Sequence, residues 1–409
     1  MTTEIIASPE VSEKGGLPNA MQRRLAILAI VFVAIDLRPA IVSIGPILPS
    51  IRKEFGLSHA TASLLTTIPD LLMGSLALPT SWLAGRFGRD RVFLISLTLL
   101  CISTAARAFS PNTTLLLTAT AGAGMGIAVA GSLIAGFIKA NFPSKAAFFI
   151  GIYATFLSVG STISAATTGP LADTAPGGWR FATGVWSALG VLAIAAWAIA
   201  TTPGSRRNAL LTPLPPARRV TLPLRNKTAW FVAIFFAFNN FLFYAILAWL
   251  APMFREYGAS QTKAGLILAC FTIAFLCGNP VFGSLSKSQD RRRWLAASAI
   301  LSSGGLIALA IVPNLAPFIW IAVSAFGLGG AFTLGMTLPL DNTHSVEQAN
   351  VWNAFVMTVG YLFAAGGPLM VGVTRDLTGS FRLPVWLLVV VSVAMLILTP
   401  LLQPSCDEL

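Results

Sequence analysis

The sequence predicts an all-α membrane protein with twelve transmembrane helices, arranged as two pseudo-symmetric six-helix bundles. Three observations support this fold class. Only 10% of the 409 residues are charged, against about 25% in soluble globular proteins, and 55% are hydrophobic. The apolar runs are long and continuous, unlike barrel strands of alternating polarity, and the mean hydropathy is +0.78. A basic, proline-rich segment divides the runs into two sets of six. Disordered chains, disulfide scaffolds and ordinary soluble enzymes are excluded.

Twelve runs are long enough to cross a bilayer, since a spanning helix needs about 20 apolar residues. In chain order they are 22–50, 60–83, 91–109, 114–140, 146–170, 180–201, 229–253, 262–286, 293–312, 316–340, 347–373 and 383–403. The predicted domains are a tail at 1–21, a bundle at 22–201, a linker at 202–228, a bundle at 229–403 and a tail at 404–409. The first segment lacks the apolar core of a signal peptide, so no cleaved signal is expected.

The distribution of basic residues predicts the orientation of the chain. An even number of spans places both termini on one side, and most Lys and Arg residues lie on that side, including six in the linker. The other side carries Arg52, Lys53, Arg107, Arg180, Arg255, Lys263, Arg375 and Arg382. This bias predicts cytoplasmic termini. The net charge of +12 is therefore expected to face anionic membrane lipid, and no nucleic-acid binding is expected.

An internal repeat supports the division into two halves. At an offset of 202 residues, the sequence EFGLS at 54–58 meets EYGAS at 256–260. The same offset brings Trp179-Arg180 to Phe381-Arg382 and 89–91 to 291–293, and Gly124-Met125-Gly126 meets Gly327-Leu328-Gly329 with one residue of slip. Each match occupies the same place in the order of spans. A duplicated six-helix unit follows, with a substrate site expected between the halves near mid-membrane.

These features resemble the major facilitator superfamily, whose members have six plus six spans, a basic middle loop and a basic loop between spans 2 and 3. That loop is LAGRFGRDR at 83–91 here, with Gly85 in place of an acid. The chain is more closely similar to the cyanate / 2-nitroimidazole permease family. The motifs are Leu37-Arg38-Pro39, LLTTIP at 64–69, Ile138-Lys139, Trp249-Leu250, GLGGAF at 327–332, Gly360-Tyr361-Leu362 and Gly367-Pro368.

The resemblance implies a secondary transporter of the bacterial inner membrane that works by alternating access. It implies that Arg38 faces the central cavity. The family usually has a side-chain amide where this chain has Gly131, and another near Met357. Less polar pocket walls are therefore expected at these two positions.

Arg38 is the first candidate substrate-binding residue. It lies about 20 Å along the first span, at 1.5 Å per residue, and therefore inside the hydrocarbon region. An arginine there costs at least about 2.5–3.5 kcal/mol, which points to a function. Its planar guanidinium suits a carboxylate or a small anion. The alternative is a structural ion pair with an acid on another helix. Pro39 is expected to bend the span, because it has no N–H.

Asp36 and Asp70 are candidates for proton coupling or for neutralising Arg38. Asp36 lies about 200° around the helix from Arg38, so a direct pair between them is not expected. Asp70 in the second span is the better geometric partner. Either acid could relay protons, and the sequence leaves both roles open.

Span 7 supplies three further candidates for the substrate site, Asn239, Asn240 and Tyr244. Asn240 is the repeat equivalent of Arg38, and Tyr244 follows one turn later on the same face. These side chains could orient a substrate, or they could form ordinary interhelical hydrogen bonds.

Tyr153 in span 5 and Tyr361 in span 11 could sandwich a flat substrate. Trp179 and Trp249, near predicted helix ends, are expected to be interfacial anchors. The glycines of spans 4 and 10 are interpreted as surfaces for close helix packing.

The sequence therefore predicts a transporter of a small polar solute, anionic or planar and heterocyclic like cyanate or a nitroimidazole. The alternative is a proton-coupled efflux antiporter for lipophilic or cationic compounds, with Asp36 and Asp70 attracting the cation. A receptor or scaffold would need a larger soluble segment than the loops offer. No catalytic constellation, metal-ligand spacing or nucleotide motif occurs, so no enzyme activity, metal or cofactor is expected. A monomer is expected.

Overall fold

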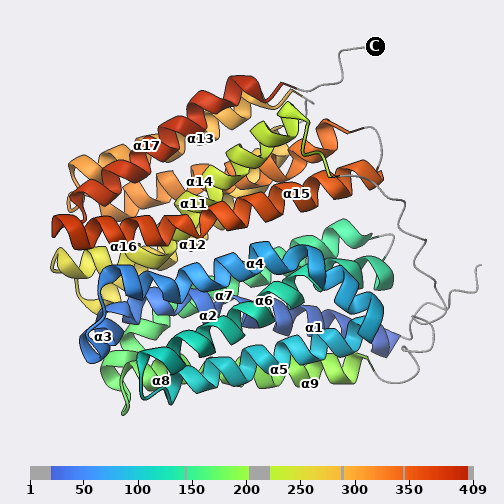
Figure 1. The fold of residues 1–409 in the computed structure, drawn as a ribbon, viewed down its shortest axis with the longest axis horizontal. Helices are drawn as coiled ribbons and strands as arrows, with labels where there is room; N and C mark the ends of the chain where they lie inside the picture. The colour runs from blue at the N-terminus through green and yellow to red at the C-terminus, as the bar shows by residue number, and fades with distance from the viewer. Residues whose placement is uncertain (1–19, 143–144, 202–221, 287–289, 344–345, 404–409) are drawn as a thin grey trace, which may run out of the picture.

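The computed structural model describes residues 20–142, 145–201, 222–286, 290–343 and 346–403. Within these ranges twelve helices are long and apolar enough to cross a membrane. They lie in two groups, with the helices of the first half of the chain on one side and those of the second half on the other (Figure 1). The predicted fold class is confirmed. The predicted tails and most of the predicted linker at 202–228 lie outside the described residues.

The helix bounds differ from the predicted spans by a few residues. The first half consists of α1 (Ala20–Leu37), α2 (Pro39–Val42), α3 (Ile44–Phe55), α4 (His59–Phe87), α5 (Arg89–Ala108), α6 (Thr113–Asn141), α7 (Ala146–Thr174), α8 (Trp179–Gly184) and α9 (Ser187–Ala200). The second half consists of α11 (Lys227–Glu256), α12 (Gln261–Leu285), α13 (Arg292–Ile311), α14 (Pro317–Asp341), α15 (Val346–Ala364), α16 (Gly366–Thr378) and α17 (Arg382–Leu398). A short 3₁₀ turn, Thr399–Leu401, follows.

The predicted repeat has the same local structure in both halves. Gly56 follows the end of α3 with φ of +63°, and Gly258 follows the end of α11 with φ of +86°. Glycine enters this left-handed region without steric cost. Ser58 and Ser260 then cap the next helix, each accepting a hydrogen bond from the backbone N–H three residues on. The repeated sequence is therefore a helix stop followed by a helix start.

The repeat also fixes how the third and fourth spans of each half pack. A Cβ on Gly126 would lie 2.7 Å from the carbonyl oxygen of Ser96, and a Cβ on Gly327 would lie 2.4 Å from that of Ser298. Ser298 is the equivalent of Ser96 at the offset of 202, so Gly126 corresponds to Gly327. The predicted alignment of Gly124 with Gly327 is wrong, because Gly124 packs on Pro69 instead.

The first span is interrupted at Arg38, where α1 ends and α2 begins. Pro39 has no N–H, so the carbonyl of Ile35 receives no helical hydrogen bond from it. The backbone N–H groups of Ile41 and Val42 both bond to the carbonyl of Arg38, which tightens the turn. The predicted effect of Pro39 is confirmed, and the break lies at the candidate arginine.

We name the membrane face where α1 begins and α17 ends the terminal face, and the other the opposite face. Hydrogen bonds between the two bundles occur on both seams, in the half next to the opposite face. On one seam, between α4 and α15/α16, the Thr67 hydroxyl donates to the carbonyl of Ala365 at 3.1 Å. On the other seam, between α7 and α12, the hydroxyls of Thr162 and Thr272 are 2.9 Å apart. Nearer the terminal face, Phe148 of α7 is 65% exposed.

Two tryptophans predicted as interfacial anchors are buried instead. Trp179 donates its indole N–H to Glu54 at 2.5 Å, and Trp249 donates to the carbonyl of Pro368 at 2.8 Å. Both indoles tie helices together inside the protein, so the prediction that they anchor the chain at the lipid interface is wrong.

Candidate functional site

Arg38 lies between the two bundles. It stands at the break between α1 and α2 and is half-buried. Its Nη1 donates a hydrogen bond to the hydroxyl of Tyr244, on α11 of the other bundle, at 3.3 Å. Its guanidinium carbon lies 6.0 Å from the centroid of the Phe243 ring. The arginine therefore points across the interface between the bundles and away from lipid.

Three of the four tyrosines of the chain surround this guanidinium. Tyr153 of α7, Tyr244 of α11 and Tyr361 of α15 all interact electrostatically with Arg38. The ring centroids of Tyr244 and Tyr361 are 6.1 Å apart. Tyr244 and Tyr361 are buried, whereas Tyr153 is half-buried. The structure thus brings together four residues predicted from the sequence, although their role in binding stays a prediction.

Asp70 of α4 belongs to the same cluster but forms no ion pair with Arg38. Its carboxyl is fully buried, and neither oxygen has a hydrogen-bond partner among the described residues. It interacts electrostatically with Arg38, Tyr244 and Tyr361. The prediction that Asp70 is the direct partner of Arg38 is wrong for this conformation, because the guanidinium donates to the phenol of Tyr244 instead.

Asp36 faces a different part of the first bundle. Its carboxyl is buried, its Oδ2 has no hydrogen-bond partner, and it interacts electrostatically with Cys101 of α5. The helical twist carries it away from Arg38, as the angle between their positions predicted. Asp36 is therefore not a charge partner of Arg38 in this structure.

Asn239 and Asn240 are both enclosed. The amide nitrogen of Asn240 donates to the carbonyl of Phe236 in its own helix at 2.8 Å. Asn239 is fully buried, and neither its oxygen nor its nitrogen has a hydrogen-bond partner. Of the three candidates on α11, Tyr244 alone contacts Arg38.

Sequence reasoning missed one polar residue of α15 that precedes Tyr361 on the same helix. Asn353 of α15 is half-buried, and its Oδ1 has no hydrogen-bond partner. It lies four and eight residues before Met357 and Tyr361, on the same helix face. That spacing could have identified it. On α6, a Cβ built on Gly131 would meet no atom within 4 Å, so this position adjoins open space.

Arg107 is a residue whose burial the sequence does not reveal. It is predicted on the side opposite the termini, and its side chain is fully buried at the end of α5. Its Nη1 donates to the carbonyl of Ala40, two residues after Arg38. Arg107 therefore supports the backbone at the break that carries the candidate arginine. The ends of apolar runs give no signal that separates a loop arginine from a buried one.

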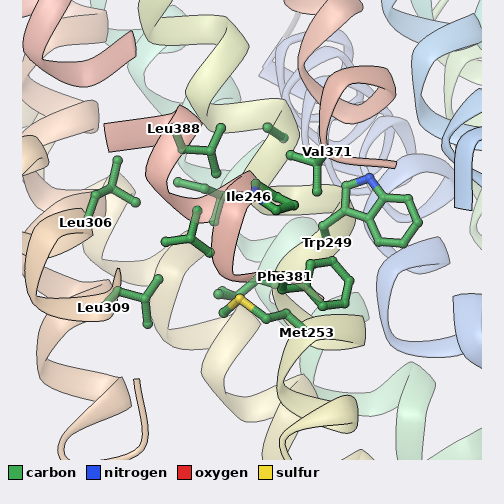
Figure 2. Close-up of a pocket in the computed structure, with 12 residues that line it drawn as sticks. Ile246, Trp249, Met253, Leu306, Leu309, Val371, Phe381 and Leu388 are labelled. Carbon is green, nitrogen blue, oxygen red and sulfur yellow. The ribbon is translucent and has the colours of Figure 1, made fainter. Parts of the chain in front are cut away.

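An apolar pocket lies away from this cluster. It is formed by α11, α13, α16 and α17, and Figure 2 shows the side chains of Ile246, Trp249, Leu306, Val371 and Leu388 around it. Its volume is about 20 Å³, room for roughly one water molecule, and no polar group faces it. A polar solute therefore has no binding partner there.

Charged groups join the bundles at the opposite face. Asp376 of α16 accepts hydrogen bonds from the backbone N–H groups of His59 and Ala60 at 2.9 and 2.8 Å, which caps the first turn of α4. The imidazole of His59 also contacts Asp376 at 2.6 Å and Glu256 at 3.4 Å. We call this group the His59–Asp376 cluster. Arg52 and Arg375 flank it.

The chain matches the sequence profile of the Major Facilitator Superfamily over residues 27–253 and 229–405. It is 31% identical to the cyanate transport protein CynX of Escherichia coli (strain K12), over 87% of this chain and 91% of that protein. It is 29% identical to the 2-nitroimidazole transporter of the same strain, over 93% of this chain and 95% of that protein. A bacterial homolog of the human lysosomal transporter Spinster has a similar fold, with a TM-score of 0.74 at 17% identity, covering 93% and 96% of the two chains. These relatives are named as transporters and not as enzymes.

Proposed function

Because the chain belongs to the Major Facilitator Superfamily, we propose that it is a secondary transporter that moves a small polar solute, anionic or planar and heterocyclic, across the bacterial inner membrane by alternating access. The observation that carries this proposal is the placement of Arg38 between the bundles. It is half-buried, and no carboxylate among the described residues forms an ion pair with it.

The electrostatics of the cluster favour an anion as cargo. An arginine in the hydrocarbon region is costly unless another group balances its charge. Tyr244 accepts only one hydrogen bond from a guanidinium that has five N–H donors. A bound anion would take up the remaining donors with bidentate geometry. A lipophilic cation, the cargo of the alternative hypothesis, would meet this positive charge directly.

The aromatic side chains favour a flat solute. The ring of Phe243 lies beside the Arg38 guanidinium. The hydroxyls of Tyr153 and Tyr361 are near enough to interact electrostatically with it. Ring faces can cover a planar solute while the hydroxyls bond its edge. The relative named for 2-nitroimidazole handles a planar heterocycle of this kind, and the relative named for cyanate handles a small anion.

We further propose that the terminal face is cytoplasmic and that this conformation opens the site to the cytoplasm. The excess of Lys and Arg on the side of the termini supports the orientation. The contacts between the bundles near the opposite face, including Thr67 with Ala365 and the His59–Asp376 cluster, support closure toward the outside. Rocking of one bundle against the other would then expose Arg38 to each side in turn.

Transport by purified protein in liposomes tests the proposal. We expect uptake of cyanate or 2-nitroimidazole, and we expect Arg38→Ala to reduce it about tenfold or more, since a hydrogen bond to a charged group contributes about 1.5–3 kcal/mol. Arg38→Lys should rescue only part of the loss, because an ammonium cannot bond in bidentate fashion.

The matched control is Arg225→Ala, at an exposed arginine before α11. It should transport like the wild type. Equal uptake by wild type and Arg38→Ala would contradict the site assignment. Uptake of tetraphenylphosphonium that survives Arg38→Ala would favour the cationic alternative.

A further inference from the structure

The carboxyl of Asp70 is a buried ionisable group that a simple anion site leaves unexplained. It lies on α4, fully buried, and both of its oxygens lack a hydrogen-bond partner. It is nevertheless close enough to Arg38 to interact with it electrostatically. Arg38 therefore donates its hydrogen bond to Tyr244, and the carboxyl of Asp70 receives none from it.

A carboxylate cannot remain charged in this environment. An ionised group removed from water without hydrogen bonds costs several kcal/mol, and in practice it takes up a proton or finds a cation. Two solutions are open to Asp70. It can hold a proton, or it can accept hydrogen bonds from Arg38. Because Arg38 is engaged with Tyr244, the geometry of this conformation fits the protonated acid.

We infer that Asp70 is a proton-binding site that competes with the transported anion for Arg38. With the proton on Asp70, the guanidinium is free to bind the anion. When the anion leaves, Arg38 moves to the carboxylate of Asp70 and the proton is released. One proton and one monovalent anion are thus carried together in the same direction, so the cycle moves no net charge. This inference rests on the proposed function and adds the coupling ion to it.

The surroundings of Asp70 contain few groups that could take over this role. Arg38 faces it from the α1/α2 break, Tyr244 from α11 and Tyr361 from α15. On the side of α6, Gly124 packs against Pro69 and adds no ionisable group. No other ionisable group in the described part of the chain interacts electrostatically with Asp70. A change in protonation therefore acts mainly on Arg38.

Liposomes with a pH gradient test the coupling, with cyanate as the probe. We expect an acidic exterior to drive accumulation by the wild type, about tenfold for each unit of pH difference when one proton accompanies one anion. Asp70→Asn resembles the protonated acid in shape, so it should still exchange cyanate at equal pH. It should lose the stimulation by the gradient, and Asp70→Glu should keep it.

Two matched variants make the result specific to Asp70. Asp173→Asn changes an exposed carboxyl on α7 and should leave the gradient stimulation unchanged. Asp36→Asn changes the other buried acid, which does not face Arg38, and should also keep it. Loss of stimulation in Asp36→Asn together with its retention in Asp70→Asn would overturn the inference.

Infrared difference spectroscopy supplies a readout that needs no substrate. The wild type should show the carbonyl band of a protonated carboxyl that is absent in Asp70→Asn and present in Asp173→Asn. If the wild type fails to move cyanate, the proposed cargo is wrong, and this band still decides whether Asp70 holds a proton. Absence of the band at neutral pH overturns the inference.

Discussion

At the scale of single residues, the site depends on what holds the Arg38 side chain in place. Arg107 bonds the backbone at Ala40, next to the break, and Tyr244 bonds the guanidinium itself. The first contact positions the main chain, and the second positions the charge. Tyr244 belongs to the other bundle, so it also makes the state of Arg38 sensitive to the relative position of the bundles.

Tyr244→Phe is expected to weaken substrate binding without unfolding the protein. The change removes a single oxygen that accepts a hydrogen bond from a charged donor, a contact worth about 1.5–3 kcal/mol. Affinity measured by ligand-induced stabilisation of the purified protein should fall about tenfold. Tyr257→Phe alters the fourth tyrosine, beyond the end of α11, and serves as the control. Equal losses in both variants would contradict a specific role for Tyr244.

Much of the site could be predicted from the sequence, because a charge in an apolar run stands out. Arg38 is identified in this way, Tyr244 by the repeat, and Tyr153 and Tyr361 as aromatic candidates in spans 5 and 11. The four side chains lie together. Whether Asp70 pairs with Arg38 could not be predicted. Spacing along the chain gives neither the position of another helix along the membrane normal nor the rotamer of its side chain. Asn239 and Asn240 were identified by the repeat, but the repeat does not tell which side of α11 is enclosed.

At the scale of elements, the interrupted first span depends on a close neighbour. Gly160 of α7 packs directly on the carbonyl of Ile35, the group that Pro39 leaves without its helical donor. A Cβ on Gly160 would lie 2.4 Å from that oxygen. The glycine therefore allows α7 to approach the break, and α7 also carries Tyr153 toward Arg38.

Gly160→Ala is expected to destabilise the first bundle, because the added methyl collides with backbone atoms that cannot move alone. Overpacking of this kind costs about 1–3 kcal/mol, which should appear as a lower Tm in detergent. Gly151→Ala on the same helix has no atom within 4 Å of the new methyl and should leave Tm unchanged or raise it slightly. An unchanged Tm for Gly160→Ala would show that α7 does not depend on this contact.

At the scale of the whole molecule, the His59–Asp376 cluster links the two bundles at the opposite face. Asp376 accepts two backbone N–H groups at the start of α4, and the imidazole of His59 reaches Asp376 and Glu256. These bonds exist only while the bundles touch there. They therefore favour the conformation described here over one in which the opposite face opens.

Asp376→Asn is expected to shift the population toward the conformation open at the opposite face. The amide cannot stabilise the α4 terminus as a carboxylate does, and a loss of about 1–3 kcal/mol changes the ratio of two conformations about 5- to 150-fold. Spin labels at Lys53 and Lys263, both exposed on the opposite face, should report a longer distance in the variant. Asp290→Asn, in the loop before α13, is the control, and no change in Asp376→Asn would contradict the role of the cluster.

The number and order of the spans could be predicted because the bilayer fixes the length of a spanning helix. The offset of 202 residues predicted the matching turns at Gly56 and Gly258 and the matching caps at Ser58 and Ser260. Contacts between the bundles could not be predicted. His59 and Asp376 are 317 residues apart, and no sequence pattern distinguishes them from other polar residues near helix ends.

The two seams between the bundles differ in the physical force that holds them. His59 at the start of α4 meets carboxylates, whereas its repeat equivalent Gln261 at the start of α12 donates to the carbonyl of Gly169 at 3.2 Å. Dissolved ions screen the carboxylates of Asp376 and Glu256, whose side chains are 30% and 35% exposed, more than they weaken a buried bond between neutral amides. A higher ionic strength at the opposite face would consequently weaken the contacts at the start of α4 more than those at the start of α12. The bundles would then separate first at the start of α4, and the salt concentration at that face would set how readily they do so.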